Sequence, residues 1–163
     1  MYTQKSSRKQ LISSVPIPLI IALSQIGTKE ISGEESNSQI NEYLKTVGQP
    51  SDDSIPWCSA FINWCLEQAG IKGTGSPAAR SFSTWGTELI EPAVGCIVVL
   101  KRGTQSWQGH VGFYLSNTSA YIYLLGGNQS DSVCITPYLK ESVISYRQKS
   151  LNSNTRQTRR EVN

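Results

Sequence analysis

Residues 56–69 read PWCSAFINWCLEQA, and this stretch decides the fold. Its apolar side chains recur at spacings of three and four, which gathers them on one face of an α-helix. Gly70 follows directly, and glycine commonly ends a helix. We therefore predict a helix over residues 57–69 that is buried along one face. The apolar positions are Cys58, Phe61, Ile62, Cys65, Leu66 and Ala69.

Helical patterns precede this stretch, and strand patterns follow it. Pro18 suits the first turn of a helix that we predict over residues 17–27, and a second helix is predicted over residues 38–47. Beyond Gly95 the apolar period changes to that of strands. Helices first and antiparallel strands afterwards indicate an α+β domain. The predicted strands are 97–100, 111–115, 120–125, 133–136 and 143–147.

The composition favours one folded domain with two distinct ends. The chain has 163 residues, of which 38% are hydrophobic and 17% charged, as in a globular protein with one core. The net charge is +3, but residues 146–163 hold five Lys or Arg and one Asp or Glu (+4), which leaves −1 for the body. Such a body does not fit a nucleic-acid reader. We expect a flexible arm at 1–15, a folded domain at 16–148 and a basic, disordered tail at 149–163.

The N-terminal region is similar to a secretory signal without matching one. Three basic residues precede an apolar stretch at 11–23, but Pro16 and Pro18 interrupt it, and no small-residue cleavage site follows. The chain also has no run of 18 apolar residues, so we expect no membrane span. We therefore expect the protein to be made in the cytoplasm without a classical signal peptide.

The four cysteines do not form a zinc or disulfide pattern. Cys58, Cys65, Cys96 and Cys134 contain no C-x-x-C pair, and His110 is the only histidine. The first two are seven residues apart on the predicted helix, a rise of about 10 Å. This rise exceeds the reach of roughly 7 Å between the Cα atoms of a disulfide. We expect free thiols and no metal or organic cofactor.

Cys58 is a candidate nucleophile because of its position in the first turn of the predicted helix. Free backbone N–H groups and the positive end of the helix dipole stabilise a thiolate there. The position alone is also compatible with a small buried hydrophobic side chain. Cys65 lies in the middle of the helix, where no such field acts, and we expect it to be structural.

His110 and Asn128 are the other candidate catalytic residues. His110 begins a predicted strand and is the one ordinary group able to exchange protons near neutral pH. Gly112 follows on the same face, where its missing side chain leaves room for a helix. Asn128 ends the next strand after two glycines, and an asparagine beside a histidine can fix the histidine tautomer. An ordinary turn residue would also suit Asn128.

Three segments in this order resemble those of the papain-like CHAP and NlpC-type cell-wall hydrolases, especially a compact subgroup of bacteria and phages. The likeness covers about residues 17–148. It implies a papain-like α+β fold, with the nucleophile at a helix start packed on a small antiparallel sheet. The segments are PWCSAFINWC (56–65), GHVGFY (109–114) and LGGNQS (125–130).

The resemblance also implies a catalytic triad and a substrate. Cys58 would be the thiolate nucleophile, His110 the general base and acid, and Asn128 the group that orients the ring. CHAP proteins often carry an acidic residue two positions before this asparagine, where this chain has Gly126, so an acidic fourth member is absent. The expected reaction is hydrolysis of an amide bond in bacterial peptidoglycan. The enzyme would be an N-acetylmuramoyl-L-alanine amidase or an endopeptidase of the stem peptide or crosslink.

Four further residues flank the triad segments in sequence and are candidates to line the substrate groove. They are Trp57, Asp53, Trp85 and Gln129. Each is equally compatible with packing or turn structure.

Two alternative functions stay open at this point. One is a papain-like acyltransferase, in which an amine replaces water, and the other is a non-catalytic cell-wall-binding module. For a hydrolase, we expect a monomer that acts in the periplasm or cell wall, as a secreted antibacterial effector or a phage endolysin. Its partner would be peptidoglycan and not nucleic acid. An effector would also have a cognate immunity protein.

Overall fold

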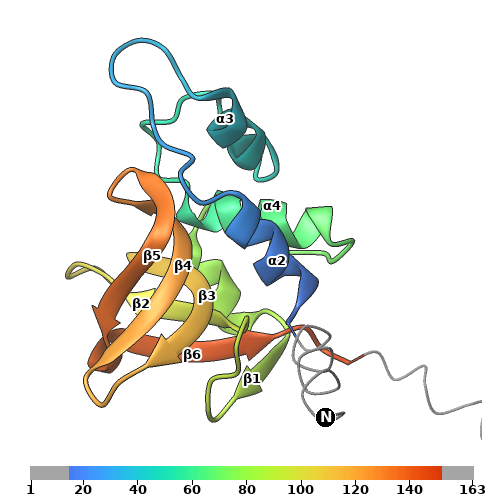
Figure 1. The fold of residues 1–163 in the computed structure, drawn as a ribbon, viewed down its shortest axis with the longest axis vertical. Coiled ribbons are helices and arrows are strands. Elements are labelled where there is room, and N and C mark those ends of the chain that lie inside the picture. The colour runs from blue at the N-terminus through green and yellow to red at the C-terminus, as the bar shows by residue number, and fades with distance from the viewer. Residues whose placement is uncertain (1–14, 152–163) are drawn as a thin grey trace, which may run out of the picture.

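A computed structural model describes residues 15–151, and Figure 1 shows three helices above a set of curled strands. The strands form one antiparallel sheet of six, in the order β1-β6-β2-β3-β4-β5. The helices are α2 (Ile17–Ser24), α3 (Ser38–Lys45) and α4 (Cys58–Gln68), with two 3-10 helices, η1 (Ala79–Thr84) and η2 (Lys140–Ser142). The strands are β1 (Thr87–Leu89), β2 (Ile97–Lys101), β3 (Gly109–Asn117), β4 (Tyr121–Gln129), β5 (Ser132–Leu139) and β6 (Val143–Gln148).

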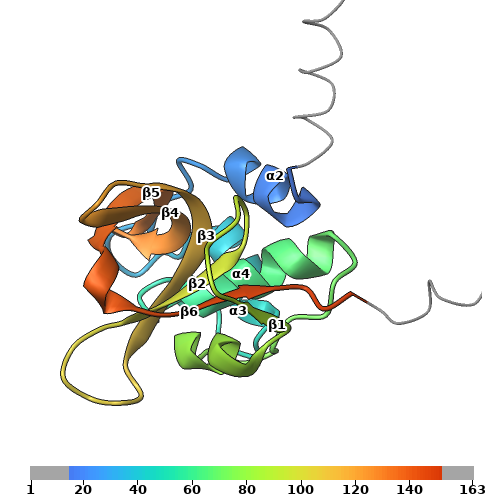
Figure 2. The ribbon, with the colours of Figure 1, turned by 90° about the horizontal axis from the view of Figure 1, so that it is seen from below.

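The predicted α+β class is confirmed, and so are the three helices and five strands. Strand β1 and the 3-10 helix η1 were not predicted, because the three residues of β1 and the six of η1 are too few for a period to show. Strand β1 pairs with β6 at the edge of the sheet, where Figure 2 shows the two strands side by side. The predicted arm at 1–15 and tail at 149–163 fall almost entirely outside the described residues and stay predictions.

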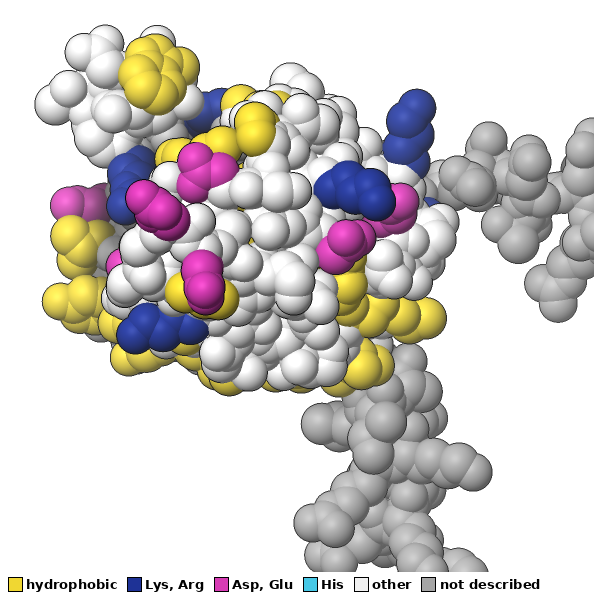
Figure 3. Space-filling model, turned by 90° about the horizontal axis from the view of Figure 1, so that it is seen from above, with side chains coloured by type: hydrophobic (Ala, Val, Ile, Leu, Met, Phe, Trp, Pro, Cys, Tyr) yellow, Lys and Arg dark blue, Asp and Glu magenta, His cyan; other side chains and the backbone are white. Residues whose placement is uncertain are grey.

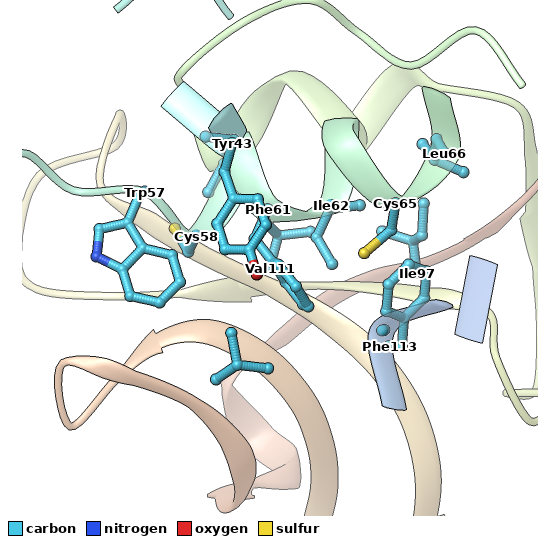
Figure 4. Close-up of a cluster of buried hydrophobic side chains, with 14 of the residues drawn as sticks. Tyr43, Trp57, Cys58, Phe61, Ile62, Cys65, Leu66, Ile97, Val111 and Phe113 are labelled. Atoms are coloured by element: carbon cyan, nitrogen blue, oxygen red, sulfur yellow. The ribbon is translucent and has the colours of Figure 1, made fainter. Parts of the chain in front are cut away.

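Helix α4 is the centre of the main hydrophobic core. It contacts the other two helices and packs on β3 and β4. Figure 4 shows Phe61, Ile62 and Cys65 pointing from α4 toward Val111 and Phe113 of β3. These side chains are fully or almost fully buried. Each large one contributes roughly 1.5–3 kcal/mol through removal from water, so the predicted apolar face is the face that fixes α4 on the sheet.

The sheet carries a second core on its other face. Side chains alternate along β2, so that Ile97 and Val99 join the core under α4 while Val98 and Leu100 join the second cluster. This cluster also holds Ile122 and Leu124 of β4. Because both faces of β2 are covered, its sequence reads as a continuous apolar run. No helix within residues 15–151 combines the length and hydrophobicity needed to cross a membrane.

Gly127 of β4 allows α4 to approach the sheet. A Cβ atom at this position would lie 2.6 Å from Cζ3 of Trp57 and 2.7 Å from Cβ of Phe61. The predicted role of Gly112 as the residue that leaves room for a helix is wrong. A Cβ atom there would meet Leu124 of the neighbouring strand, 3.1 Å away. The close approach of α4 therefore depends on β4, the strand that also carries Asn128 and Gln129.

We expect Gly127→Ala to destabilise the protein by about 2 kcal/mol or more, because the added methyl group overlaps a rigid indole ring and the first turns of α4. Gly112→Ala is the matched control, since its closest contacts, Cβ of Leu124 at 3.1 Å and the carbonyl oxygen of Leu125 at 3.2 Å, are longer and require a smaller adjustment. Urea unfolding of both variants measures the difference. A Gly127→Ala protein as stable as Gly112→Ala would contradict this account of the packing.

Candidate active site

Cys58 is the first residue of α4, and Figure 4 shows its sulfur at the start of the helix, close to Val111. The side chain is buried, with 7% of its surface exposed. Burial raises the pKa of the Cys58 thiol above its ordinary value, while hydrogen bonds from the backbone of Ser59 and Val111 and the charge of Arg102 act in the opposite direction. The thiol therefore keeps its proton at rest, in a place equipped to stabilise the thiolate once it forms.

His110 directly precedes Val111, whose backbone N–H reaches the Cys58 sulfur, so the backbone of His110 lies beside the thiol. Its side chain is 2% exposed. Burial lowers the pKa of His110 to about 4, and the hydrogen bond with Gln129 only partly opposes this effect. The ring is thus neutral near pH 7 and ready to accept a proton. Its Nδ1 atom has no hydrogen-bond partner within the described part of the chain.

Gln129 holds the other nitrogen of the ring and determines which tautomer is present. Oε1 of Gln129 lies 2.9 Å from Nε2 of His110. The amide nitrogen of Gln129 donates to the carbonyl oxygens of Cys134 (2.6 Å) and Leu124 (3.3 Å), so Oε1 must be the atom that faces the ring. Nε2 of His110 therefore carries the hydrogen, and Nδ1 is the free acceptor.

Tyr138 of β5 reinforces this arrangement. Its hydroxyl donates to the same Oε1 of Gln129 at 3.0 Å, and its ring lies against that of His110 with centroids 5.1 Å apart. Burial raises the pKa of Tyr138, which keeps the hydroxyl protonated and able to donate. Oε1 of Gln129 thus connects the ring of His110 on β3 to Tyr138 on β5.

The structure places Gln129 on the ring, where the sequence predicted Asn128. The cause is an irregularity in the β4–β5 ladder: Gly126 pairs with Cys134 and Gln129 with Ser132, so two residues of β4 oppose one of β5. Asn128 lies in this bulge with φ of 54°, a left-handed conformation that asparagine tolerates. The extra residue moves Gln129 into the position that Asn128 would take in a regular strand.

Gly126 makes room for the Gln129 amide. A Cβ atom at Gly126 would lie 2.7 Å from Oε1 of Gln129, so any side chain there would displace the amide from the ring. This is the position at which many CHAP proteins carry an acidic residue. The amide of Gln129 reaches back three residues and fills the space beside it.

The structure corrects the expectation that four flanking residues line a groove at Cys58. Gln129 is buried on His110, as described above. Trp57 is fully buried and donates from Nε1 to Glu30 at 2.7 Å. Asp53 is 4% exposed and accepts hydrogen bonds from the backbone of Ile31 and Asn37, which ties two loops together. Trp85 donates to the Lys72 carbonyl and borders a different cavity.

A groove of about 850 Å³ does open over Cys58, and it includes Asn128. Sequence reasoning missed its other functional side chains, because loop residues show no period. Trp107, in the loop between β2 and β3, was the detectable signal: a large aromatic residue among polar ones, 71% exposed in the structure. The charged side chains of the groove are Glu30, Arg102 and Asp131.

Neither the face shown in Figure 3 nor the acidic residues of the described chain indicate another class of site. On the face shown in Figure 3, acidic and basic side chains are scattered and do not gather into a patch of one sign. Within residues 15–151, no group of three or more His, Cys, Asp or Glu side chains is placed to hold a metal ion. The cysteine and histidine beside the groove are therefore the candidate reactive pair.

Comparisons with known proteins give a family match and similar solved structures. The CHAP domain family model matches residues 50–128, which include Cys58 and His110. A comparison with curated protein sequences gives no match. A solved structure of an NLP/P60 family protein similar to lipoprotein, from Staphylococcus aureus subsp. aureus Mu50, matches with a TM-score of 0.51 and 19% identity. The match covers 83% of this chain and 41% of that protein, so the chain spans less than half of its length.

A second solved structure is RipD from Mycobacterium tuberculosis, described as a non-catalytic NlpC/p60 domain protein adapted to a peptidoglycan-binding function. It matches with a TM-score of 0.45 and 19% identity, covering 80% of this chain and 92% of RipD. The family match includes the start of α4 and the whole of β3, the elements that carry the reactive pair. Residues 50–128, just under half of the chain, thus match the CHAP domain family model, and the fold of the chain is similar to that of a solved NLP/P60 family protein.

Proposed function

We propose that this protein hydrolyses an amide bond of bacterial peptidoglycan, acting as a secreted antibacterial effector or a phage endolysin. The bond would be the N-acetylmuramoyl-L-alanine amide or one within the stem peptide or its crosslink. One observation carries the proposal. Gln129 fixes His110 as the tautomer with a free Nδ1, and the next residue of β3 contacts the Cys58 thiol at the start of a helix. A merely structural histidine would not need a buried, unpartnered nitrogen.

The first half of the reaction uses the neutral pair. As Sγ of Cys58 attacks the amide carbonyl, Nδ1 of His110 takes the thiol proton, and the positive ring keeps its Nε2 hydrogen bond to Gln129. The backbone N–H of Cys58, at the helix start, is a donor for the developing oxyanion. The C–N bond then breaks as Nδ1–H gives its proton to the departing amine, which leaves a thioester on Cys58.

The second half reverses the roles. Nδ1 of His110 removes a proton from water, the hydroxide oxygen attacks the thioester carbonyl, and the sulfur leaves as thiolate and takes the proton back. An acyltransferase would follow the same steps with an amine in place of water. A wall-binding module would use none of them.

Purified peptidoglycan digested with the protein should give new muropeptides that mass spectrometry identifies by a gain of water at one amide. Cys58→Ala should abolish this activity, because no other group can form the thioester. Cys65→Ala is the matched control: it removes a buried sulfur from the same helix face and should reduce stability by about 1–2 kcal/mol without loss of chemistry. Hydrolysis by Cys58→Ala would disprove the mechanism. Joined fragments would indicate a transferase, and binding without products a wall-binding module.

The orienting role should belong to Gln129 and not to Asn128. Gln129→Ala removes the acceptor of Nε2 and should lower kcat roughly 100-fold or more, as loss of tautomer control does in other triads. Tyr138→Phe keeps the ring and removes one hydrogen bond to Oε1, so its loss should be smaller. Asn128→Ala should change kcat least. Steady-state kinetics on one soluble muropeptide gives the order, and a larger kcat loss in Asn128→Ala than in Gln129→Ala would reverse the assignment.

Acid should destabilise the protein through His110. Its pKa is about 4 in the folded protein and 6.5 ordinarily, so between these values the unfolded chain binds more protons. The stabilising contribution of the neutral ring is complete above about pH 6.5 and is lost as the pH falls toward 4. The shift corresponds to up to about 3 kcal/mol. Urea unfolding at several pH values should show a shallower acid decline for His110→Gln than for the wild type. Parallel declines would mean that other groups dominate.

A further inference from the structure

Arg102 is a cation in the groove that has no counter-ion among residues 15–151. In the described part of the chain, the one ion pair joins Arg147 to Glu88, and the guanidinium of Arg102 takes part in no hydrogen bond. It nevertheless lies close enough to the reactive pair for its charge to act on Cys58 and on His110. A guanidinium presents a planar fork of N–H groups that fits a carboxylate with two hydrogen bonds. A substrate carboxylate would supply what the protein does not.

The loop that carries Arg102 is held in place at its far end. Nε of Arg80, on η1, donates to the Gln108 carbonyl at 2.8 Å, and the side chain of Gln108 accepts from the backbone of Gln105 at 3.1 Å. Gln108 lies two residues before His110. The far end of the loop is therefore fixed directly to the strand that carries the proposed base, whereas the exposed side chain of Arg102 becomes ordered only when a ligand binds.

Trp107 of the same loop adds an apolar surface to the same groove. It lines the groove and is 71% exposed, which is unusual for the largest side chain and is typical of a surface that a ligand covers. A ligand that covers the indole would also exclude water from around the guanidinium. Charge pairs gain strength when water is excluded, so the two side chains work together.

The opposite flank of the groove has the other sign. Asp131 lies in the β4–β5 turn, and its carbonyl accepts from the backbone of Glu30 at 2.9 Å. This turn and the β2–β3 loop lie at the same end of the sheet, on either side of the start of β3 and His110. The groove therefore runs from an anionic flank, past the reactive pair, to a cationic flank. A carboxylate on the substrate has one favourable place in it.

We propose that Arg102, with Trp107, forms a carboxylate-binding subsite that selects stem peptides with a free carboxylate next to the cleaved amide over the same peptides with that group amidated. This inference rests on the proposed function, because it takes peptidoglycan peptides as the ligand. It makes Arg102 a specificity-determining residue. A rival role, in which Arg102 acts only through the thiol of Cys58, would affect every substrate by the same factor.

The test compares two soluble muropeptides that differ only in this group, the free acid and the carboxamide. The wild type should favour the acid by about tenfold in KM, which is the ratio that 1.4 kcal/mol gives, and added salt should reduce this preference. R102Q should bring the ratio close to one. K101Q is the matched control, since Lys101 is the exposed cation next in sequence and does not line the groove, and it should keep the wild-type ratio. An R102Q protein with an unchanged ratio would overturn the subsite.

Calorimetric binding of the same two muropeptides to the Cys58→Ala protein separates this inference from the proposed reaction. If the Cys58→Ala protein binds the acid more tightly than the carboxamide, and the double variant with R102Q does not, the subsite is supported. This result would hold even if the wild type cleaved neither peptide. In that case only the proposed hydrolysis would be disproved. Equal affinity for the two peptides, or no binding of either, overturns the subsite whatever the wild type cleaves.

Discussion

The hydrogen bond between Nε2 of His110 and Oε1 of Gln129 is the interaction on which the candidate site depends. It determines the tautomer of the ring, since it assigns the hydrogen to Nε2 and leaves Nδ1 as a free acceptor. It also links three strands, because the same amide contacts carbonyl groups of β4 and β5 and the hydroxyl of Tyr138. A buried amide with all of these partners has little freedom to rotate.

Burial determines the protonation states of the two candidate catalytic groups beside this hydrogen bond. Removal from water raises the pKa of Cys58 and lowers that of His110, so both groups rest in their neutral forms. Charge would then appear only as the thiol proton moves to the ring, in a region where backbone N–H groups and Arg102 already favour the thiolate. The fixed dipoles that would stabilise the charged state are in place before it forms.

The sequence was sufficient for the fold and for naming Cys58 and His110 as candidates, whose catalytic roles stay predictions, but it did not reveal that Gln129 contacts the ring. Periodic apolar positions revealed α4 and the long strands because burial imposes a period on them. Cys58 and His110 could be named from chemistry: one sits at a helix start and the other is the only histidine. Gln129 could not, because a bulge breaks the two-residue period of β4 just before it. Trp107 and Arg102 lie in a loop, where no period exists and only the folded chain shows what faces the groove.

The space above Gly126 has a consequence for how such domains diverge. Here the group beside the histidine ring is delivered from residue 129, across a position that has no side chain; elsewhere in the family an acidic residue often stands at that position itself. A chain with both side chains would have a steric clash, and a chain with neither would lack the acceptor. Exchange between the two arrangements therefore passes through impaired intermediates, so the two positions should vary as a pair. An alignment that scores each column separately would record the changes at positions 126 and 129 as unrelated, although they are coupled in the structure.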